Sequence, residues 1–426
     1  MTNPKSRIVS GIAANFYSQV VTVIAQLISL PIFLTWWSAE QYGRWLMISA
    51  IPAYLGISDV GILTAAGNLM SMHQARHETA EVNRIFSSSV VAMLVVLPTL
   101  ALCAAALLFS FSFGLSLDQR GALCALILTT LLSVACSLFD AAYRPFGKYP
   151  RATFLLTSAR VLDYVGMFAG LIIGGSLTST ALGFLIARAI DCVAMFFLAK
   201  NDIPEIRWNL RNMDARLIRR LMRSGIGFLS FPFGYLLTLQ GMLIVVGAQL
   251  GGSAVALFSS SRTLTRLLAQ VSDTAGRSMA PEISALYGAG REPEAIALSN
   301  QVLRNAILLV LFGALALAFL GPTILQHWSR GKLHFDGTVF GFLLLAAIAS
   351  TYWQIQGVRL TATNRHSLLA TIFALSSAFA LLMAYLTEPL FGLSATAAAA
   401  CFVDIAMIVG TTIALRRVAA AGYRPT

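Results

Sequence analysis

Four charged residues lie on one face of a predicted membrane-spanning helix at residues 254–283. At the ~100° that an α-helix turns per residue, Arg262, Arg266, Asp273 and Arg277 fall within a sector of about 60°. A charge at membrane depth costs several kcal/mol unless it faces water, a partner or a ligand. Three cations and one anion on this stripe therefore predict a water-accessible internal surface that receives an anionic ligand, which is typical of a transporter.

Arg266 is the strongest single candidate on the stripe. Arg277 has Asp273 one turn away, and Arg262 lies close enough to the membrane surface to extend its side chain toward it. Arg266 has neither an acid within one turn nor an easy route to the surface. We therefore expect Arg266 to bind the anion, with Arg262 and Arg277 beside it.

Other predicted spans also carry charges. Arg160 and Asp163 lie three residues apart, as do Arg188 and Asp191. This spacing suits an ion pair within one helix as well as a place in a cavity, and both alternatives stay open. Arg304 is a further candidate for a charge in the cavity.

Three carboxylates are candidates for coupling or gating: Asp59, Asp273 and Asp404. Asp59 and Asp404 have no cation nearby in sequence, and a desolvated carboxylate can exchange a proton or bind Na⁺. The alternative for Asp59 is a capping role where the helix breaks, because Gly56 and Gly61 flank it.

The first predicted span carries an uncharged stripe. Asn15, Gln19, Thr22 and Gln26 lie within about 60° of one another by helical spacing. Amides and hydroxyls suit contacts with sugar hydroxyls, but they equally suit hydrogen bonds between membrane helices.

No motif predicts an enzyme, a cofactor or a metal site. His73 and His77 lack both a glutamate after His73 and a third ligand, and Gly147-Lys148 lacks the glycine spacing of a phosphate-binding loop. The five cysteines have spacings that suit neither disulfides nor zinc, so we expect small packing residues: Cys103, Cys124, Cys136, Cys192 and Cys401. Energy for transport must then come from an ion gradient, the membrane potential or the substrate's own gradient.

Composition identifies the elements that hold these residues. The chain of 426 residues is 57% hydrophobic and 11% charged, with a mean hydropathy of +0.76, which indicates a membrane protein. Its apolar runs do not alternate as barrel strands do. Stretches of about 20 residues give twelve predicted helices, near 10–36, 44–68, 85–112, 121–143, 153–174, 180–199, 224–249, 254–283, 299–320, 337–357, 367–386 and 394–415.

The net charge of +12 follows the membrane topology rather than a nucleic-acid site. With a cytoplasmic N-terminus, twenty of the 30 Lys and Arg residues lie in cytoplasmic segments, four lie outside and six lie within spans. This asymmetry is the positive-inside pattern and predicts that both termini are cytoplasmic. Binding to nucleic acid is not expected.

The chain divides into two predicted six-helix lobes, 1–199 and 224–426, joined by a basic cytoplasmic linker at 200–223. A shift of 214 residues aligns Ser58-Asp59 with Ser272-Asp273 and repeats the hydropathy profile, which predicts a pseudo-two-fold axis along the membrane normal. In the linker, apolar and basic residues interleave from Leu217 onward. This pattern suits a helix on an anionic leaflet, and it equally suits a solvated loop that fixes topology.

The chain resembles the polysaccharide-exporter branch of the multidrug/oligosaccharidyl-lipid/polysaccharide flippase superfamily. The resemblance covers essentially the whole chain and rests on the two lobes and on the order of four short motifs. These are Leu30-Pro31, Glu40-Gln41-Tyr42-Gly43-Arg44-Trp45, Ser58-Asp59-Val60-Gly61-Ile62 and Ala280-Pro281-Glu282-Ile283-Ser284-Ala285-Leu286-Tyr287.

The resemblance implies translocation of an undecaprenyl-pyrophosphate-linked oligosaccharide to the outer leaflet of a bacterial inner membrane, by alternating access, for O-antigen or other surface polysaccharide. It implies that Arg262, Arg266 and Arg277, which match by span, receive the pyrophosphate. It also implies partners in the glycan polymerase and chain-length machinery, alongside membrane lipids. Related lipid II flippases usually have two further helices that form a groove for the lipid tail, whereas twelve helices are expected here, which leaves the route of the tail open.

Two other functions remain alternatives. A cation-coupled exporter of drugs or organic ions from the same superfamily would favour acidic and aromatic cavity walls, whereas the stripe has a net charge of +2. A glycan polymerase or ligase would need a sizeable outer domain, and the longest predicted outer segment, 321–336, is too short to form one.

Overall fold

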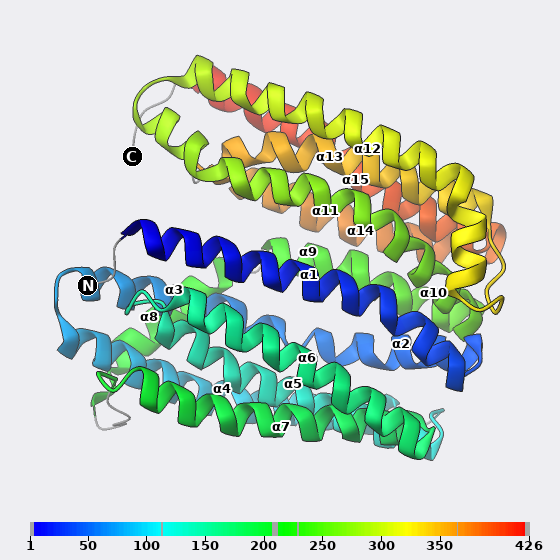
Figure 1. Ribbon diagram of the computed structural model, residues 1–426, viewed down its shortest axis with the longest axis horizontal. Helices are drawn as coiled ribbons and strands as arrows, with labels where there is room; N and C mark the ends of the chain where they lie inside the picture. Colours follow the sequence, from blue (N-terminus) through cyan, green and yellow to red (C-terminus); the bar gives the residue numbers. More distant parts are fainter. Residues whose placement is uncertain (1–3, 112–113, 207–211, 228–229, 364, 422–426) are drawn as a thin grey trace. The chain divides into compact units, whose positions relative to one another are not determined.

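Helices form all the regular structure in the described part of the chain. The computed structural model describes residues 4–111, 114–206, 212–227, 230–363 and 365–421, and contains no strand in these ranges (Figure 1). Each of the twelve predicted spans overlaps at least one of its helices. The predicted all-α, multi-pass fold is confirmed.

The chain forms two compact units. Unit 1 comprises Met1–Trp36 and Ile48–Leu229, and unit 2 comprises Trp37–Met47 and Ser230–Thr426. Residues 37–47 thus pack with the second half of the chain, and the basic segment 200–223 belongs to unit 1. The lobe limits expected from the sequence stay a prediction.

In unit 1, α7 packs against both α5 and α6, α1 packs against α6, and α3 packs against α4 and α8. A capping box at Ser116 and Gln119 starts α5, and a second one at Ser176 and Ser179 starts α7. The helices are α1 (Pro4–Trp36), α3 (Ile57–Ala75), α4 (Thr79–Phe111), α5 (Leu117–Tyr143), α6 (Tyr149–Gly174), α7 (Leu177–Asp202) and α8 (Ala215–Gly227).

In unit 2, α13 and α14 both pack against α15, α11 packs against α12 and α13, and α9 packs against α14. A π-helical turn, η2 (Leu237–Gly241), joins α9 to α10. The helices are α9 (Ser230–Leu236), α10 (Met242–Leu250), α11 (Gly252–Gly288), α12 (Glu292–Trp328), α13 (Gly337–Thr361), α14 (Ser367–Phe391) and α15 (Leu393–Ala421). The helix α2 (Ala39–Ala53) begins in unit 2.

Ten helices of the described residues are long and apolar enough to span a membrane. Two of the twelve predicted spans are not among them, for different reasons. The span at 44–68 is divided into α2 and α3 by a turn in which the Leu55 N–H donates to the Pro52 carbonyl at 2.9 Å. The span at 254–283 lies in α11, whose charged stripe lowers its hydropathy.

The start of α2 packs closely against the start of α11. A Cβ on Gly43 would lie 1.7 Å from the Gly252 carbonyl oxygen, so only glycine fits there. The Glu40 carboxylate accepts hydrogen bonds from the Ser253 backbone N–H at 2.8 Å and from its hydroxyl at 3.2 Å. The Glu40–Trp45 motif thus joins residues 37–47 to unit 2.

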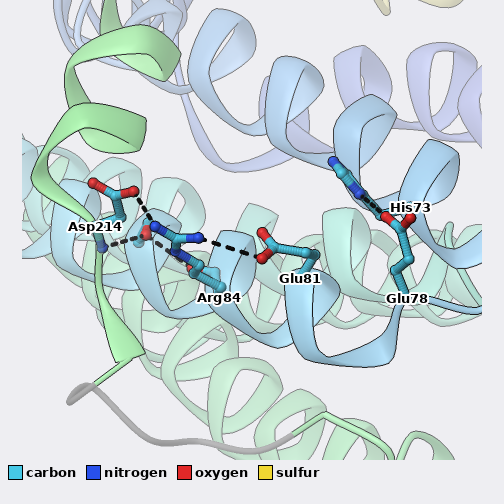
Figure 2. Close-up of polar contacts among 6 residues, drawn as sticks. His73, Glu78, Glu81, Arg84 and Asp214 are labelled. Carbon is cyan, nitrogen blue, oxygen red and sulfur yellow. Dashed lines mark hydrogen bonds and ion pairs between the residues drawn. The ribbon is translucent and has the colours of Figure 1, made fainter.

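The basic linker helix α8 is amphipathic, but unit 1 covers part of its apolar side. Leu221 is fully buried, and Leu217 and Ile218 pack against the core that α3 and α4 help to form. Figure 2 shows the Arg84 side chain of α4 between the carboxylates of Asp214 and Glu81, at 2.5 and 3.3 Å. These contacts fix the start of α8 on α4.

One prediction about cysteine is wrong. Cys136 of α5 and Cys192 of α7 form a disulfide, with their Cα atoms 5.8 Å apart. Spacing in sequence could not show this pair, because the packing of α7 against α5 brings them together. Cys103, Cys124 and Cys401 are free.

Candidate functional site

A cavity of about 580 Å³ lies within unit 2. It is lined by residues of α9, η2, α11, α13, α14 and α15. All four residues of the predicted α11 stripe line this cavity: Arg262, Arg266, Asp273 and Arg277. Because a regular helix repeats every 3.6 residues, their spacing places them along one wall.

The three arginines of the stripe have different surroundings. Arg277 forms an ion pair with Asp273, and both side chains are largely exposed. Arg262 is half-buried. Its guanidinium lies 5.1 Å from the centre of the Phe258 ring, and its Nη1 donates to the Thr238 carbonyl at 3.4 Å. Arg262 is therefore held by neutral groups rather than by an acid.

Arg266 is exposed at the cavity wall. Among the described residues it forms no ion pair within 4 Å, although it acts electrostatically on Asp404 and Tyr235, which also line the cavity. Its guanidinium thus keeps donors for a ligand. The binding of an anion by Arg266 stays a prediction.

Asp404 of α15 belongs to the same cavity. Its Oδ1 accepts a hydrogen bond of 2.8 Å from Trp353 Nε1 on α13. Trp353 and Tyr235 were not among the predicted site residues, because an aromatic residue in an apolar span gives no signal of its own. The charged lining of three arginines and two aspartates has a net charge of +1.

Polar groups without a charge complete the lining. Gln270, Gln354 and Ser350 lie on α11 and α13. Gln354 Oε1 is buried and has no hydrogen-bond partner among the described residues. The cavity therefore combines guanidinium donors, aromatic rings and a free amide oxygen.

The other predicted cavity charges lie elsewhere. Arg188 of α7 pairs with Asp163 of α6, and its Nη1 lies 3.7 Å from Asp191 Oδ2. The Arg188–Asp191 pair within one helix exists, but the shorter contact crosses between helices. Arg160 donates to Thr22 Oγ1 at 2.7 Å and forms no ion pair with Asp163 within 4 Å. These residues belong to unit 1, so none lines the cavity of unit 2.

The uncharged stripe of α1 also lies in unit 1. Thr22 accepts the hydrogen bond from Arg160, and Asn15 Oδ1 accepts one of 3.3 Å from the Tyr149 hydroxyl. Both partners are on α6, so two residues of the stripe make hydrogen bonds between helices. Gln19 and Gln26 lie on the same helix.

Two predicted residues remain. The backbone of Asp59 is part of α3, but its side chain lies outside the described part of the structure. Arg304 is exposed on α12 and is not part of the cavity lining.

No protein-family model and no curated protein matches the sequence. Solved structures do match. A multidrug resistance transporter of the MATE family, in the MOP superfamily, aligns with 93% of this chain and 98% of its own, at 14% identity and a TM-score of 0.78. The lipid II flippase MurJ aligns over 96% and 87%, at 13% identity and a TM-score of 0.65.

A further MATE structure, in a straight conformation, aligns over 98% and 97% of the two chains, at 15% identity and a TM-score of 0.60. At these identities the similarity shows the fold. The chain has the fold of multi-pass membrane transporters of the MOP superfamily. These neighbours are described as transporters and a flippase, not as enzymes.

Proposed function

We propose that this chain translocates an isoprenoid-pyrophosphate-linked oligosaccharide from the inner to the outer leaflet of a bacterial inner membrane. In this proposal both termini are cytoplasmic, the transport cycle is alternating access, and the product enters surface polysaccharide synthesis. Glycan polymerase and chain-length proteins act on the same product and are the expected partners.

The environment of Arg266 is the observation that supports the proposal most directly. It is exposed at a cavity wall in a membrane protein, and among the described residues it has no acidic partner within 4 Å. A pyrophosphate supplies the negative charge and the paired oxygens that a guanidinium binds best. Arg262, which is held by Phe258 and Thr238, supplies a second cation on the same face.

The rest of the lining suits a glycan headgroup. Aromatic rings and amides are the groups that contact sugar rings and hydroxyls. Tyr235 and Trp353 provide the rings, and Gln354 Oε1 is an acceptor that lacks a donor. A bound hydroxyl would remove the cost of leaving this buried acceptor unpaired. The lipid tail needs no place in the cavity, because it can remain in the bilayer.

A cation-coupled exporter of organic ions is the second candidate. It is favoured by Asp404 beside Trp353, by the aromatic residues Phe231 and Phe373 in the lining, and by the similarity to MATE transporters. In such an exporter the Asp404 carboxylate would bind the cation, and the Arg266 guanidinium would repel it.

Two ligands of opposite charge distinguish the candidates. We expect the purified protein to bind undecaprenyl pyrophosphate in detergent and to bind tetraphenylphosphonium weakly or not at all. Arg266→Ala should weaken pyrophosphate binding at least about tenfold, because a hydrogen bond to a charged group contributes ~1.5–3 kcal/mol. Arg266→Lys should recover only part of this affinity, since an ammonium cannot form the paired contact.

Arg304→Ala is the matched control, because it removes an exposed arginine that lies outside the cavity. Cells with each variant should also be scored for surface polysaccharide, normalised to the amount of protein in the membrane. Full export and unchanged pyrophosphate affinity in both Arg266 variants would refute the proposal. Stronger binding of tetraphenylphosphonium in Arg266→Ala would favour the exporter.

A further inference from the structure

The linker helix α8 carries a face made of arginines. By helical spacing, four of them fall within a sector of about 100°: Arg216, Arg219, Arg220 and Arg223. The helix contains no acidic residue. Arg216 and Arg219 are exposed, and neither forms an ion pair within 4 Å with a described residue. This face of α8 is therefore a positively charged surface without an acidic partner in the described part of the chain.

The apolar side of α8 is largely covered by unit 1. Leu221 is fully buried, and Leu217 and Ile218 pack against the same apolar core. Met222, at the edge of this side, stays exposed. Because most of its apolar side is used within unit 1, α8 is not free to insert that side into a bilayer. The helix presents its arginine face outward instead.

Most acids at this end of unit 1 are bonded to basic side chains outside α8. Asp214, which precedes α8, uses both oxygens: Oδ1 accepts from the Arg216 backbone N–H at 2.8 Å, and Oδ2 pairs with Arg84 at 2.5 Å (Figure 2). Four further acids have partners there: Glu78 with His73, Glu81 with Arg84, Asp140 with Arg144 and Asp202 with Arg151. Glu205 is exposed and forms no ion pair within 4 Å with a described residue. The guanidinium groups of Arg216 and Arg219 thus keep their donors for a ligand.

Contacts with α4 place the start of α8 at the ends of membrane-spanning helices. Both α4, which begins at Thr79, and α7, which ends at Asp202, are long and apolar enough to span a membrane. Asn83 of α4 donates to the Glu205 carbonyl at 3.2 Å, and the ion pair of Asp214 with α4 follows nine residues later. The segment that leads into α8 is thus fixed where spans end, which is the level of the lipid headgroups.

We propose that the arginine face of α8 binds the phosphate groups of anionic phospholipids such as phosphatidylglycerol. Guanidinium groups bind phosphate oxygens through paired hydrogen bonds, and each basic residue beside an anionic leaflet adds roughly a factor of five in affinity. The attraction is electrostatic, because the apolar side of α8 packs on unit 1. The bound lipids hold the linker helix at the membrane surface. This surface is separate from the cavity of unit 2 and does not rest on the proposed substrate, since it needs only a chain that spans a membrane.

The test uses the whole purified protein in detergent and counts bound lipids by native mass spectrometry. Phosphatidylglycerol and phosphatidylcholine are offered in equal amounts, because both carry a phosphate and only the first has a net negative charge. We expect the wild type to retain phosphatidylglycerol preferentially, and less of it as the ammonium acetate concentration rises and screens the charges. In lipid nanodiscs, hydrogen exchange of the peptide that covers residues 215–227 should be slower with phosphatidylglycerol than with phosphatidylcholine.

Two double variants separate charge from structure. Arg216→Gln/Arg219→Gln should weaken phosphatidylglycerol binding at least about tenfold, as expected for the loss of two basic residues at an anionic surface. Arg216→Lys/Arg219→Lys should keep most of the preference, because attraction to the lipid depends on charge. Both variants should keep the wild-type Tm, since the two side chains are exposed. If the glutamine pair lowers Tm, the single variants Arg216→Gln and Arg219→Gln still test the face.

Arg291→Gln/Arg304→Gln is the matched control, because it removes the same net charge from two exposed arginines of unit 2. It should bind phosphatidylglycerol like the wild type. A wild type without a preference for phosphatidylglycerol overturns the proposal, as does an unchanged preference in the glutamine pair. An equal loss in the control or in the lysine pair also overturns it, because charge on α8 would not be the cause. Displacement of the lipid by inorganic phosphate at constant ionic strength would identify a free anion as the ligand and overturn the proposal too.

Discussion

Trp353 Nε1 donates a hydrogen bond of 2.8 Å to Asp404 Oδ1 across the interface of α13 and α15. The two residues are 51 positions apart, and both line the cavity that contains the arginines of α11. The indole holds the carboxylate at the part of the cavity wall formed by α13 and α15, within electrostatic range of Arg266. Asp404 is thus positioned to tune the potential that an anionic ligand meets.

Asp404→Asn separates the two candidate functions. Asparagine keeps an oxygen that can accept from Trp353 Nε1, so the shape of the cavity should be retained. For the proposed flippase, affinity for undecaprenyl pyrophosphate should stay the same or rise by up to about fivefold, as expected for removing a nearby anion at ~1 kcal/mol. Titration of the purified variant measures this change. A loss of pyrophosphate binding would contradict it.

The α11 part of the site was predictable from the sequence because all four charges lie on one helix. Helical periodicity alone places Arg262, Arg266, Asp273 and Arg277 on one wall. The part of the wall formed by α13, α14 and α15 was not predictable, because it depends on how these helices pack. Asp404 stood out as an unpaired acid in an apolar span, whereas its partner Trp353 did not.

Packing between helices also explains the other differences from the predicted fold. Arg188 and Asp163 are 25 positions apart and pair because α6 and α7 pack together. Spacing within one helix suggested only the partners three residues away. The twelve spans followed from hydropathy, but the break between α2 and α3 did not, because it lies inside an apolar run.

Arg188→Ala should destabilise unit 1. Its guanidinium is largely buried between the carboxylates of Asp163 and Asp191, which would lose their cation. Removing one partner of a buried ion pair costs on the order of 3–5 kcal/mol. Thermal unfolding in detergent should show a clearly lower Tm. The double variant Arg188→Ala/Asp163→Asn should recover part of it, and a Tm equal to that of Arg304→Ala would show that the cluster is not stabilising.

Glu40 should make stability depend on acid pH. Burial opposes ionisation of Glu40, but hydrogen bonds from the Ser253 backbone, the Arg44 side chain and the Gly252 backbone outweigh it and hold the pKa below its ordinary value of 4.5. A lowered pKa in the folded state stabilises the fold above the unfolded value. This contribution is lost as the pH falls below about 4.5 and through the lowered folded pKa.

Glu40→Gln measures that contribution. The variant should be less stable than the wild type near neutral pH, by about 1 kcal/mol or less because Glu40 is partly exposed. The two unfolding midpoints should approach each other as the pH is lowered below about 4.5. A difference in Tm that stays constant from pH 7 to pH 3 would show that ionisation of Glu40 is not the cause.

Gly43→Ala should be among the most damaging single-methyl changes in unit 2. The new Cβ would lie 1.7 Å from the Gly252 carbonyl oxygen and 2.3 Å from its carbonyl carbon, and backbone atoms cannot rotate away as a side chain can. The start of α2 would have to move from α11, which would also break the contacts of Glu40 with Ser253. We expect a loss of more than about 3 kcal/mol, at the upper end of overpacking effects.

Gly341→Ala is the control for Gly43→Ala, because both glycines lie inside helices and a Cβ on Gly341 meets no atom within 4 Å. Alanine should be neutral there or stabilise α13 by about 0.5–1 kcal/mol through its helix propensity. Tm and the yield of monodisperse protein should therefore fall for Gly43→Ala and stay at or above the wild-type values for Gly341→Ala. Equal behaviour of the two variants would mean that α2 and α11 do not pack through Gly43, and the role assigned to the Glu40–Trp45 motif would be wrong.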